Sequence, residues 1–510
     1  YSQIDRTKVP EAGKAPVIEI GEYQEFKLKN GLHVILVENH KLPIISFQLS
    51  SEYVPFLEGD KTGMSDFVAS MIGSGTETNT KAQLDEALDY IGASFFSSGI
   101  DGFYASSLKK HQNKLLELVS DIIFNPNFPQ KEFEKVKKQI ISALESQKSD
   151  PNAISSNMVS LINFGLEHPY GELTTKETIG NINVEDLKNL YNTYFKPNIS
   201  YLVIVGDMDI KEAKKVAKKY FKKWKYGEVP KKDLKKYNNP SGTQVHFSHK
   251  EGAAQSVIKL TYPLNLKPNN KNIIASKVMN SILGGSFSGR LNLNLREDKA
   301  FTYGARSSTS ADNFVGSFSA TASVRNEVTD SAVTEFIYEL NNIKTDLVKT
   351  EEIELAKNYM TGTFSISLEN PKMAGKLALN TKINKLDENY YKNYLKNLNN
   401  VTKKDILEFA SKYIDSKNCN IVIVGDKEIA QKLQKFDSDG SITYYDANYK
   451  IIDGIKKEIP EGITAEVVIQ KNIEVCGGEQ NMNNWDDVTI KYEIEISGAP
   501  MKVSLETNFK

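Results

Sequence analysis

An internal repeat constrains the fold of this 510-residue chain more than any other feature. Residues 186–207 read DLKNLYNTYFKPNISYLVIVGD, and residues 405–426 read DILEFASKYIDSKNCNIVIVGD, which aligns with the first copy without a gap. In each copy a helix-like run leads into a short apolar strand that ends at Gly-Asp. The two copies are 219 residues apart, so the chain is predicted to contain two copies of one α+β domain.

Composition around the repeat divides the chain into segments. Residues 231–243, KKDLKKYNNPSGT, have the polar, Pro- and Gly-containing composition of a linker. Residues 1–20 are mostly polar and contain Pro10 and Pro16, which favours an extended arm. The predicted segments are an N-terminal arm (1–20), a first domain (21–230), the linker (231–243), a second domain (244–440) and a C-terminal appendage (441–510).

Local patterns predict helices that pack on a largely antiparallel sheet. Residues 26–37 read as a hairpin because two strand-like halves flank Asn30-Gly31, a strong turn dipeptide. A third strand is predicted over 44–50, and one-sided apolar residues predict helices over 84–91 and 133–144. Strands and helices alternate without βαβ regularity, which indicates an α+β fold.

The C-terminal appendage has a different pattern from the repeat. A short helix is predicted over 462–478, ending at Gly477-Gly478. Two strands are predicted over 488–496 and 501–509, joined at Gly498-Ala499-Pro500. Since a single hairpin is barely stable in water, we expect these strands to begin an incomplete β-rich domain.

Composition excludes several classes of protein. Hydrophobic residues make up 40% of the chain, charged residues 25%, and the formal net charge is −1, which gives no general attraction to nucleic acid. No apolar run approaches the roughly 18–20 residues that cross a bilayer. The two cysteines, Cys419 and Cys476, form neither a disulfide framework nor a zinc motif, and Cys419 is expected to be a buried thiol. The chain begins at Tyr1, which raises the expectation that an export signal has been removed.

The residues that bear on function lie between Leu283 and Ser308, in LGGSFSGRLNLNLREDKAFTYGARSS. Arg296 and Tyr303 stand seven residues apart, and a guanidinium fork with a phenolic O–H supplies donors that can hold and polarise a carbonyl oxygen. The alternative is a surface arginine and a half-buried tyrosine at a helix-to-strand turn. The glycines that support this segment, by flexible approach to a substrate or by turn geometry alone, are Gly284, Gly285 and Gly289.

The repeat, this segment and FGLEHPYG at 164–171 together resemble the insulinase/pitrilysin family of inverted zinc peptidases. The resemblance covers about residues 20–435 and is strongest to the short two-domain type that includes subunits of mitochondrial processing peptidase. It implies that active members carry H-x-x-E-H on a helix, with two zinc-binding histidines and a glutamate as general base.

In this chain the matching stretch is GMSDFVASMIGSGT at 63–76. Asp66 stands at the first histidine, Ala69 at the glutamate and Ser70 at the second histidine. Alanine cannot accept a proton, and a lone Asp and Ser make a poor zinc site. Glu145 is near the position of the family's third ligand, although the register is not fixed and an exposed helix glutamate is the favoured interpretation.

The six histidines do not offer a replacement site. His246 and His249 lie three apart in a strand-like run, so their side chains should face opposite sides. His168 belongs to the HPYG turn and is expected to be a structural hydrogen-bonding residue. The chain is therefore predicted to bind no zinc and to cleave no peptide by itself.

The resemblance implies a division of labour between two chains. Arg296 and Tyr303 would bind the backbone of an extended peptide near the scissile carbonyl, while a partner subunit carries H-x-x-E-H and the zinc. This chain would then be the non-catalytic subunit of a heterodimeric metallopeptidase in the periplasm or cell envelope of a bacterium. The alternative is a peptidase-like scaffold or peptide-binding protein with no catalytic role; a homodimer with unrelated hydrolytic chemistry lacks any triad or dyad spacing.

Overall fold

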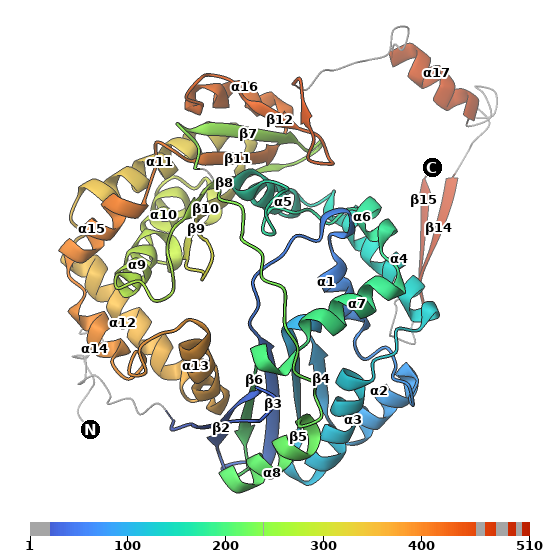
Figure 1. The fold of residues 1–510 in the computed structure, drawn as a ribbon. Helices are drawn as coiled ribbons and strands as arrows, with labels where there is room; N and C mark the ends of the chain where they lie inside the picture. The colour runs from blue at the N-terminus through green and yellow to red at the C-terminus, as the bar shows by residue number, and fades with distance from the viewer. Residues whose placement is uncertain (1–20, 238, 455–464, 476–487, 496–501, 510) are drawn as a thin grey trace, which may run out of the picture. The chain divides into compact units, whose positions relative to one another are not determined.

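A computed structural model describes residues 21–237, 239–454, 465–475, 488–495 and 502–509. The chain divides into two compact units, with the boundary after Ile452. The first unit contains two mixed sheets with helices packed on them (Figure 1), which confirms the α+β prediction. Within the described ranges, no helix combines the length and the apolar composition required to span a membrane.

The first sheet has the strand order β1-β2-β6-β3-β5-β4. Neighbours in it run antiparallel except the parallel pair β2 and β6. The predicted hairpin is confirmed as β1 paired with β2, and its turn places Gly31 at φ 97°, in the left-handed region that favours glycine. The strands are β1 (Gln24–Lys27), β2 (His33–Glu38), β3 (Ile44–Ser51), β4 (Ser94–Ser97), β5 (Gly102–Leu108) and β6 (Ser200–Gly206).

The second sheet has the order β13-β12-β7-β11-β8-β10-β9, and its last five strands repeat the order of β2, β6, β3, β5 and β4. β7 and β11 form the parallel pair that corresponds to β2 and β6, and β8, β10 and β9 follow as antiparallel neighbours. The predicted boundary at residue 440 is too early, because β12 pairs with β7 and extends this sheet. The strands are β7 (Gln244–His249), β8 (Gln255–Leu264), β9 (Thr302–Ser310), β10 (Gly316–Arg325), β11 (Asn420–Gly425), β12 (Thr443–Tyr445) and β13 (Ile451–Ile452).

Helices cover both sheets. The helix predicted over 84–91 is confirmed by α2, which ends one residue earlier, and the helix predicted over 133–144 lies within α4. The helices of the first half are α1 (Met64–Met71), α2 (Lys81–Tyr90), α3 (Gln112–Phe124), α4 (Gln130–Gln147), α5 (Pro151–Phe164), α6 (Lys176–Asn181), α7 (Val184–Tyr194) and α8 (Ile210–Phe221). Those of the second half are α9 (Ile273–Asn280), α10 (Arg290–Asn292), α11 (Thr329–Thr345), α12 (Thr350–Ser367), α13 (Pro371–Ile383), α14 (Tyr394–Asn400), α15 (Lys403–Tyr413) and α16 (Ala430–Leu433).

The repeated sequence forms the same structure twice. α7 and α15 each begin with a capping box, in which the cap side chain accepts a hydrogen bond from the backbone N–H of the residue three positions later. The pairs are Asn183 with Asp186 and Thr402 with Asp405, again 219 residues apart. Each box satisfies two backbone donors that the first turn leaves free, so both helices begin at equivalent positions. The strands that follow, β6 and β11, occupy equivalent places in the two sheets.

Each half contributes one helix to the sheet of the other half. α5 packs on β8 and β11, where Ile154 and Met158 contact Val422 and Val424 (Figure 1). α13 packs on β2 and β6 through Ala374, Ala378 and Leu379. This reciprocal exchange buries apolar surface between the halves, which explains why they lie together in one compact unit.

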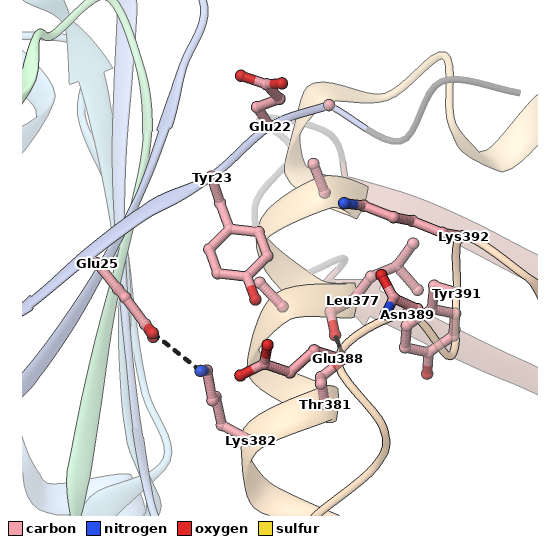
Figure 2. Close-up of a pocket in the computed structure, with 13 residues that line it drawn as sticks. Glu22, Tyr23, Glu25, Leu377, Thr381, Lys382, Glu388, Asn389, Tyr391 and Lys392 are labelled. Carbon is pink, nitrogen blue, oxygen red and sulfur yellow. Dashed lines mark hydrogen bonds and ion pairs between the residues drawn. The ribbon is translucent and has the colours of Figure 1, made fainter.

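The contact of α13 with the first half continues into a cavity of about 960 Å³ (Figure 2). Tyr23 lies between β1 and α13 there, and Lys382 Nζ forms an ion pair with Glu25 Oε1 at 2.9 Å. Burial lowers the pKa of Lys382, but the hydrogen bond to Glu25 and the negative charges of Glu25 and Glu388 together raise this pKa above its ordinary value. Because neither Arg296 nor Asp66 lines the cavity, it is separate from the segments that the sequence singled out.

A buried polar network fastens α5 to the second sheet. The side chain of Asn420 donates to Asn163 Oδ1 at 3.1 Å, and Asn163 Nδ2 donates to Thr261 Oγ1 at 2.9 Å. His246 Nε2 lies 3.2 Å from Asn420 Oδ1, and its Nδ1 lies 3.2 Å from the Tyr445 hydroxyl. This arrangement fits a neutral ring that donates from Nε2 to the amide oxygen and accepts at Nδ1.

Acid is expected to destabilise the protein through His246. Burial lowers the pKa of His246 to about 4 from 6.5. Between these pH values the unfolded chain binds a proton that the folded chain does not, so stability is present above about pH 6.5 and is lost on the way to about pH 4. We expect the free energy of unfolding to fall by about 3 kcal/mol over this pH range, which is measured as a decrease in the urea midpoint. In His246→Gln the urea midpoint should depend less on pH. Parallel pH profiles for the two proteins would contradict this assignment.

The second unit contains α17 (Ala465–Val475) and the antiparallel pair β14 (Val488–Glu495) and β15 (Lys502–Phe509). The predicted helix and both predicted strands are therefore confirmed over these ranges. Gly477-Gly478, Gly498-Ala499-Pro500 and Cys476 lie outside the described residues. Cys419, in the first unit, is fully buried as expected, and burial raises the pKa of its thiol to about 12.

Candidate functional site

Helix α1 holds the degenerate zinc motif in a well-formed setting. The Glu58 carboxylate caps this helix by accepting from the N–H groups of Gly63, Met64 and Ser65 at 2.6, 2.9 and 2.8 Å. Phe67, on the inner face, stacks on Phe133 of α4 with ring centroids 4.7 Å apart. The helix is therefore built and anchored by residues other than those at the motif positions.

The side chains at the motif positions do not fit a zinc ion. Asp66 and Ser70 are exposed, and Ser70 Oγ donates to the backbone carbonyl of Asp66 at 2.9 Å. Ala69 offers no donor atom. Glu145 on α4 is half exposed and lies 3.3 Å from Lys148 Nζ. Among the described residues, no group of three or more His, Cys, Asp or Glu side chains is arranged to hold a metal ion.

Two residues that the sequence did not single out lie beside this helix. Tyr53 donates a 2.5 Å hydrogen bond to Asp101 Oδ1. Burial raises the pKa of Asp101, and the negative charge of Asp66 raises it further. No local sequence pattern links Tyr53 to Asp101, 48 residues later; the sheet brings the end of β3 next to the turn before β5. Two carboxylates therefore lie at α1, that of Asp66 on the helix and that of Asp101 beside it, and Asp101 is hydrogen-bonded to Tyr53.

Zinc content provides a direct test of the motif. We expect the purified chain to bind substoichiometric zinc, because its exposed Asp and Ser replace two imidazole ligands. The triple substitution Asp66→His, Ala69→Glu and Ser70→His restores the spacing on an existing helix and should raise zinc content towards one ion per chain. Metal analysis after dialysis measures both, and a stoichiometric wild-type value would contradict the interpretation of α1.

The segment from Leu283 to Ser308 forms two π-helical turns and an edge strand. The turn η5 spans Ser281–Gly285, and η6, which carries Arg296, spans Leu293–Asp298. β9 carries Tyr303 and lies at the edge of the second sheet. The N–H of Phe301 donates to the carbonyl of Leu295 at 2.8 Å and that of Ala300 to Arg296 at 3.1 Å, which closes the turn between the two donors.

Both donors lie at the protein surface. The Arg296 guanidinium lies over the Phe287 ring, 4.6 Å from its centroid, and its Nε is 3.5 Å from Glu297 Oε1. Tyr303 is 91% exposed, so the alternative of a half-buried tyrosine is wrong. The phenol is therefore open to a ligand, and the guanidinium is partly oriented by a ring stacked beneath it.

The three glycines of the segment are closely packed. A Cβ on Gly284 would lie 2.6 Å from the backbone nitrogen of Ser307 in β9, and one on Gly289 would lie 2.9 Å from the Cα of Gly284. A Cβ on Gly285 would lie 2.5 Å from the side chain of Asn280. None of the three has a left-handed φ. At Gly284 a side chain is excluded because η5 approaches the backbone of β9 closely.

The FGLEHPYG motif connects the two halves. His168 is buried, stacks on Phe164 at 5.3 Å and accepts from the N–H of Tyr170 at 3.1 Å, which confirms the prediction of a structural role. The Tyr170 hydroxyl donates to Asp312 Oδ1, in the β9–β10 connection, at 3.1 Å. The motif therefore supports the turn at the far end of the strand that carries Tyr303.

Comparisons with known proteins match both halves of the chain to one family of peptidases. The family model described as Insulinase (Peptidase family M16) matches residues 57–170, and Peptidase M16 inactive domain matches residues 181–360. An uncharacterized zinc protease of Bacillus subtilis, YmxG, is 24% identical over 366 residues, covering 69% of this chain and 86% of that protein. A non-peptidase homolog of Helicobacter pylori, also named YmxG, is 24% identical over 412 residues, covering 78% and 92%. The structure of a peptidase M16 inactive domain from Pseudomonas fluorescens aligns with a TM-score of 0.72 at 20% identity, covering 79% and 98%.

Proposed function

Because this chain belongs to the insulinase family of peptidases, family M16, we propose that it is a non-catalytic subunit of a two-chain metallopeptidase. One observation carries the proposal: α1 has lost the side chains that bind zinc, while the second half presents Tyr303 and Arg296 at the surface. A scaffold needs neither an exposed phenol nor a guanidinium held beside an edge strand.

In this proposal the chain contributes hydrogen-bond donors to a substrate that is cleaved elsewhere. The phenolic O–H and the guanidinium N–H groups would donate to backbone carbonyl oxygens of an extended peptide near the scissile bond. The outer edge of β9 is unpaired within the described sheet, so an extended peptide could add to it as a further strand. Zinc, in the partner's H-x-x-E-H site, would supply the activation of water.

The second candidate function is peptide binding or scaffolding without any role in catalysis. The Helicobacter pylori relative, described as a non-peptidase homolog, favours it. Under this function the chain would leave cleavage by any zinc subunit unchanged. The loss of metal ligands from α1 suits both functions equally, so only the behaviour of a mixed complex separates them.

Reconstitution tests the proposal. The chain is combined with the H-x-x-E-H subunit from the same source, and cleavage of unstructured peptides is compared with that of each chain alone. Activity that requires both chains supports the two-chain peptidase, whereas full activity of the zinc subunit alone contradicts it. Cell fractionation of the source organism tests the periplasm or cell envelope, the location that belongs to the same proposal.

A further inference from the structure

A cavity of about 820 Å³ lies on the second half between α11, η6 and the start of α12. Five acidic and three basic side chains line it, so its charge is negative overall. One of the bases is already engaged: Arg290 donates to both oxygens of Glu352, at 2.6 and 2.8 Å. Neither Arg296 nor Tyr303 lines this cavity, so a ligand bound in it is independent of the two donors proposed to hold substrate.

The cavity contains hydrogen-bond acceptors without enough donors. Asn294 Nδ2 donates to Glu335 Oε2 at 2.9 Å and to Glu339 Oε1 at 2.8 Å. Its own Oδ1 is buried and has no hydrogen-bond partner in the described part of the protein. A buried acceptor left without a donor costs about 1–3 kcal/mol. Because this atom is closed off from the cavity, the acceptors that a ligand can reach are the carboxylates of Glu335 and Glu339.

Glu339 is a second buried acceptor that lines this cavity. The residue is only 8% exposed, and within the described ranges no Lys, Arg or His nitrogen lies within 4.0 Å of its carboxylate. Burial raises the pKa of Glu339, while the hydrogen bond from Asn294 and the positive charge of Arg290 act against this rise and the charges of Glu335 and Glu352 add to it. Lys299 is 3.9 Å from Glu335, at the edge of a direct ion pair, and does not neutralise Glu339.

Exposed apolar side chains line the same cavity. Leu293, Tyr338 and Leu347 are 46%, 55% and 58% exposed. Apolar walls over an acidic floor match a side chain that has an aliphatic stem and a cationic head. A metal ion is a poorer fit, because the described residues contain no cluster of metal-ligating side chains.

We propose that this cavity, defined by Asn294, Glu335 and Glu339 with the three apolar residues, is a socket for a lysine or arginine side chain of a partner protein. The ammonium or guanidinium would donate to the carboxylate of Glu335 and to the free oxygen of Glu339, while its stem packs on Leu293, Tyr338 and Leu347. Such a residue, buried in a pocket with an apolar surround, has the character of an interface anchor.

Carboxyl NMR of the full chain tests the socket. The protein is labelled with ¹³C-glutamate, and the Glu339 resonance is assigned by its loss in Glu339→Gln. N-acetylarginine amide and N-acetyl-lysine amide serve as probes, and N-acetylnorleucine amide is the neutral control of similar shape. We expect a cationic probe to lower the apparent pKa of Glu339 by about one unit, a tenfold shift in its proton affinity, and the neutral probe to leave it unchanged.

The two cationic probes distinguish a guanidinium socket from an ammonium socket, and a response to either supports the proposal. Glu335→Gln, which keeps Glu339 observable, should weaken the response, whereas Glu354→Gln, on the exposed face of α12, should not. If neither cationic probe moves the Glu339 resonance, or if norleucine amide moves it equally, the cavity is merely hydrated and the proposal is overturned.

Discussion

Replacing Arg296 with alanine is expected to lower kcat/KM of the reconstituted two-chain peptidase by about a hundredfold, the usual cost of removing one preorganised donor from a reacting carbonyl. The structure supports a large effect because Phe287 beneath the guanidinium and the closed turn of η6 hold the side chain beside β9 before any substrate arrives. Tyr303→Phe removes one O–H from an exposed ring and should cost about tenfold, with little effect on folding.

Matched substitutions separate substrate contact from general damage. Tyr90→Phe, on α2, changes a tyrosine that is 88% exposed, close to the 91% of Tyr303, and should leave activity unchanged. Arg296→Lys keeps the charge but loses the planar fork, so it should recover only part of the lost activity. Steady-state kinetics of the complex, with assembly checked by gel filtration, measure these effects. Unchanged kcat/KM in Arg296→Ala and Tyr303→Phe would favour the scaffold over the peptidase subunit.

Gly206→Ala is expected to destabilise the first unit by more than about 3 kcal/mol, a size reserved for backbone strain and severe overpacking. Gly206 ends β6 with φ 134°, and a Cβ placed there would lie 2.1 Å from the backbone oxygen of Ile44. Since that oxygen belongs to the adjoining strand, neither atom can move without breaking the sheet.

The repeat supplies the control for this substitution. Gly425 is the equivalent residue of β11, yet its φ is not left-handed, and an added Cβ would meet the side chain of Ser256 at 2.7 Å. A side chain yields more readily than a strand, so Gly425→Ala should cost only about 1 kcal/mol. Urea unfolding followed by fluorescence compares the two variants with the parent. Equal losses in the free energy of unfolding would contradict the prediction that glycine is required more strictly at position 206 than at position 425.

The sequence predicted local features well, because local physical chemistry determines them. Asn30-Gly31 predicted the first hairpin, and one-sided apolar residues predicted α2 and α4. The strands of the second unit were also predicted nearly to their ends. In each case the signal is a turn dipeptide or a periodicity that lies within one element.

The candidate site was only partly predictable. The residue types at 66, 69 and 70 are enough to predict that the family's zinc site is absent, since Asp and Ser stand at both histidine positions and alanine cannot act as the general base. The exposure of Tyr303 was not predictable, because it depends on β9 being an edge strand. The hydrogen bond between Tyr53 and Asp101 was missed for the same reason, as it depends on how strands far apart in sequence are ordered.

By itself the sequence determined that this protein is built from two copies of one α+β arrangement, since helix caps and apolar strands repeat at a constant offset. It also predicted, through the family resemblance, that the copies differ in chemistry, with Asp66 and Ser70 at the metal-ligand positions of one and Arg296 and Tyr303 in the other. Only the tertiary structure decided that α5 and α13 each pack on the sheet of the other half. It also decided that a Cβ at Gly206 would meet a backbone atom whereas one at Gly425 would meet a side chain, and that the Asn294 acceptor near Glu339 has no donor. Those features arise from packing between segments that are distant along the chain, where burial and close approach leave no periodic trace in the sequence.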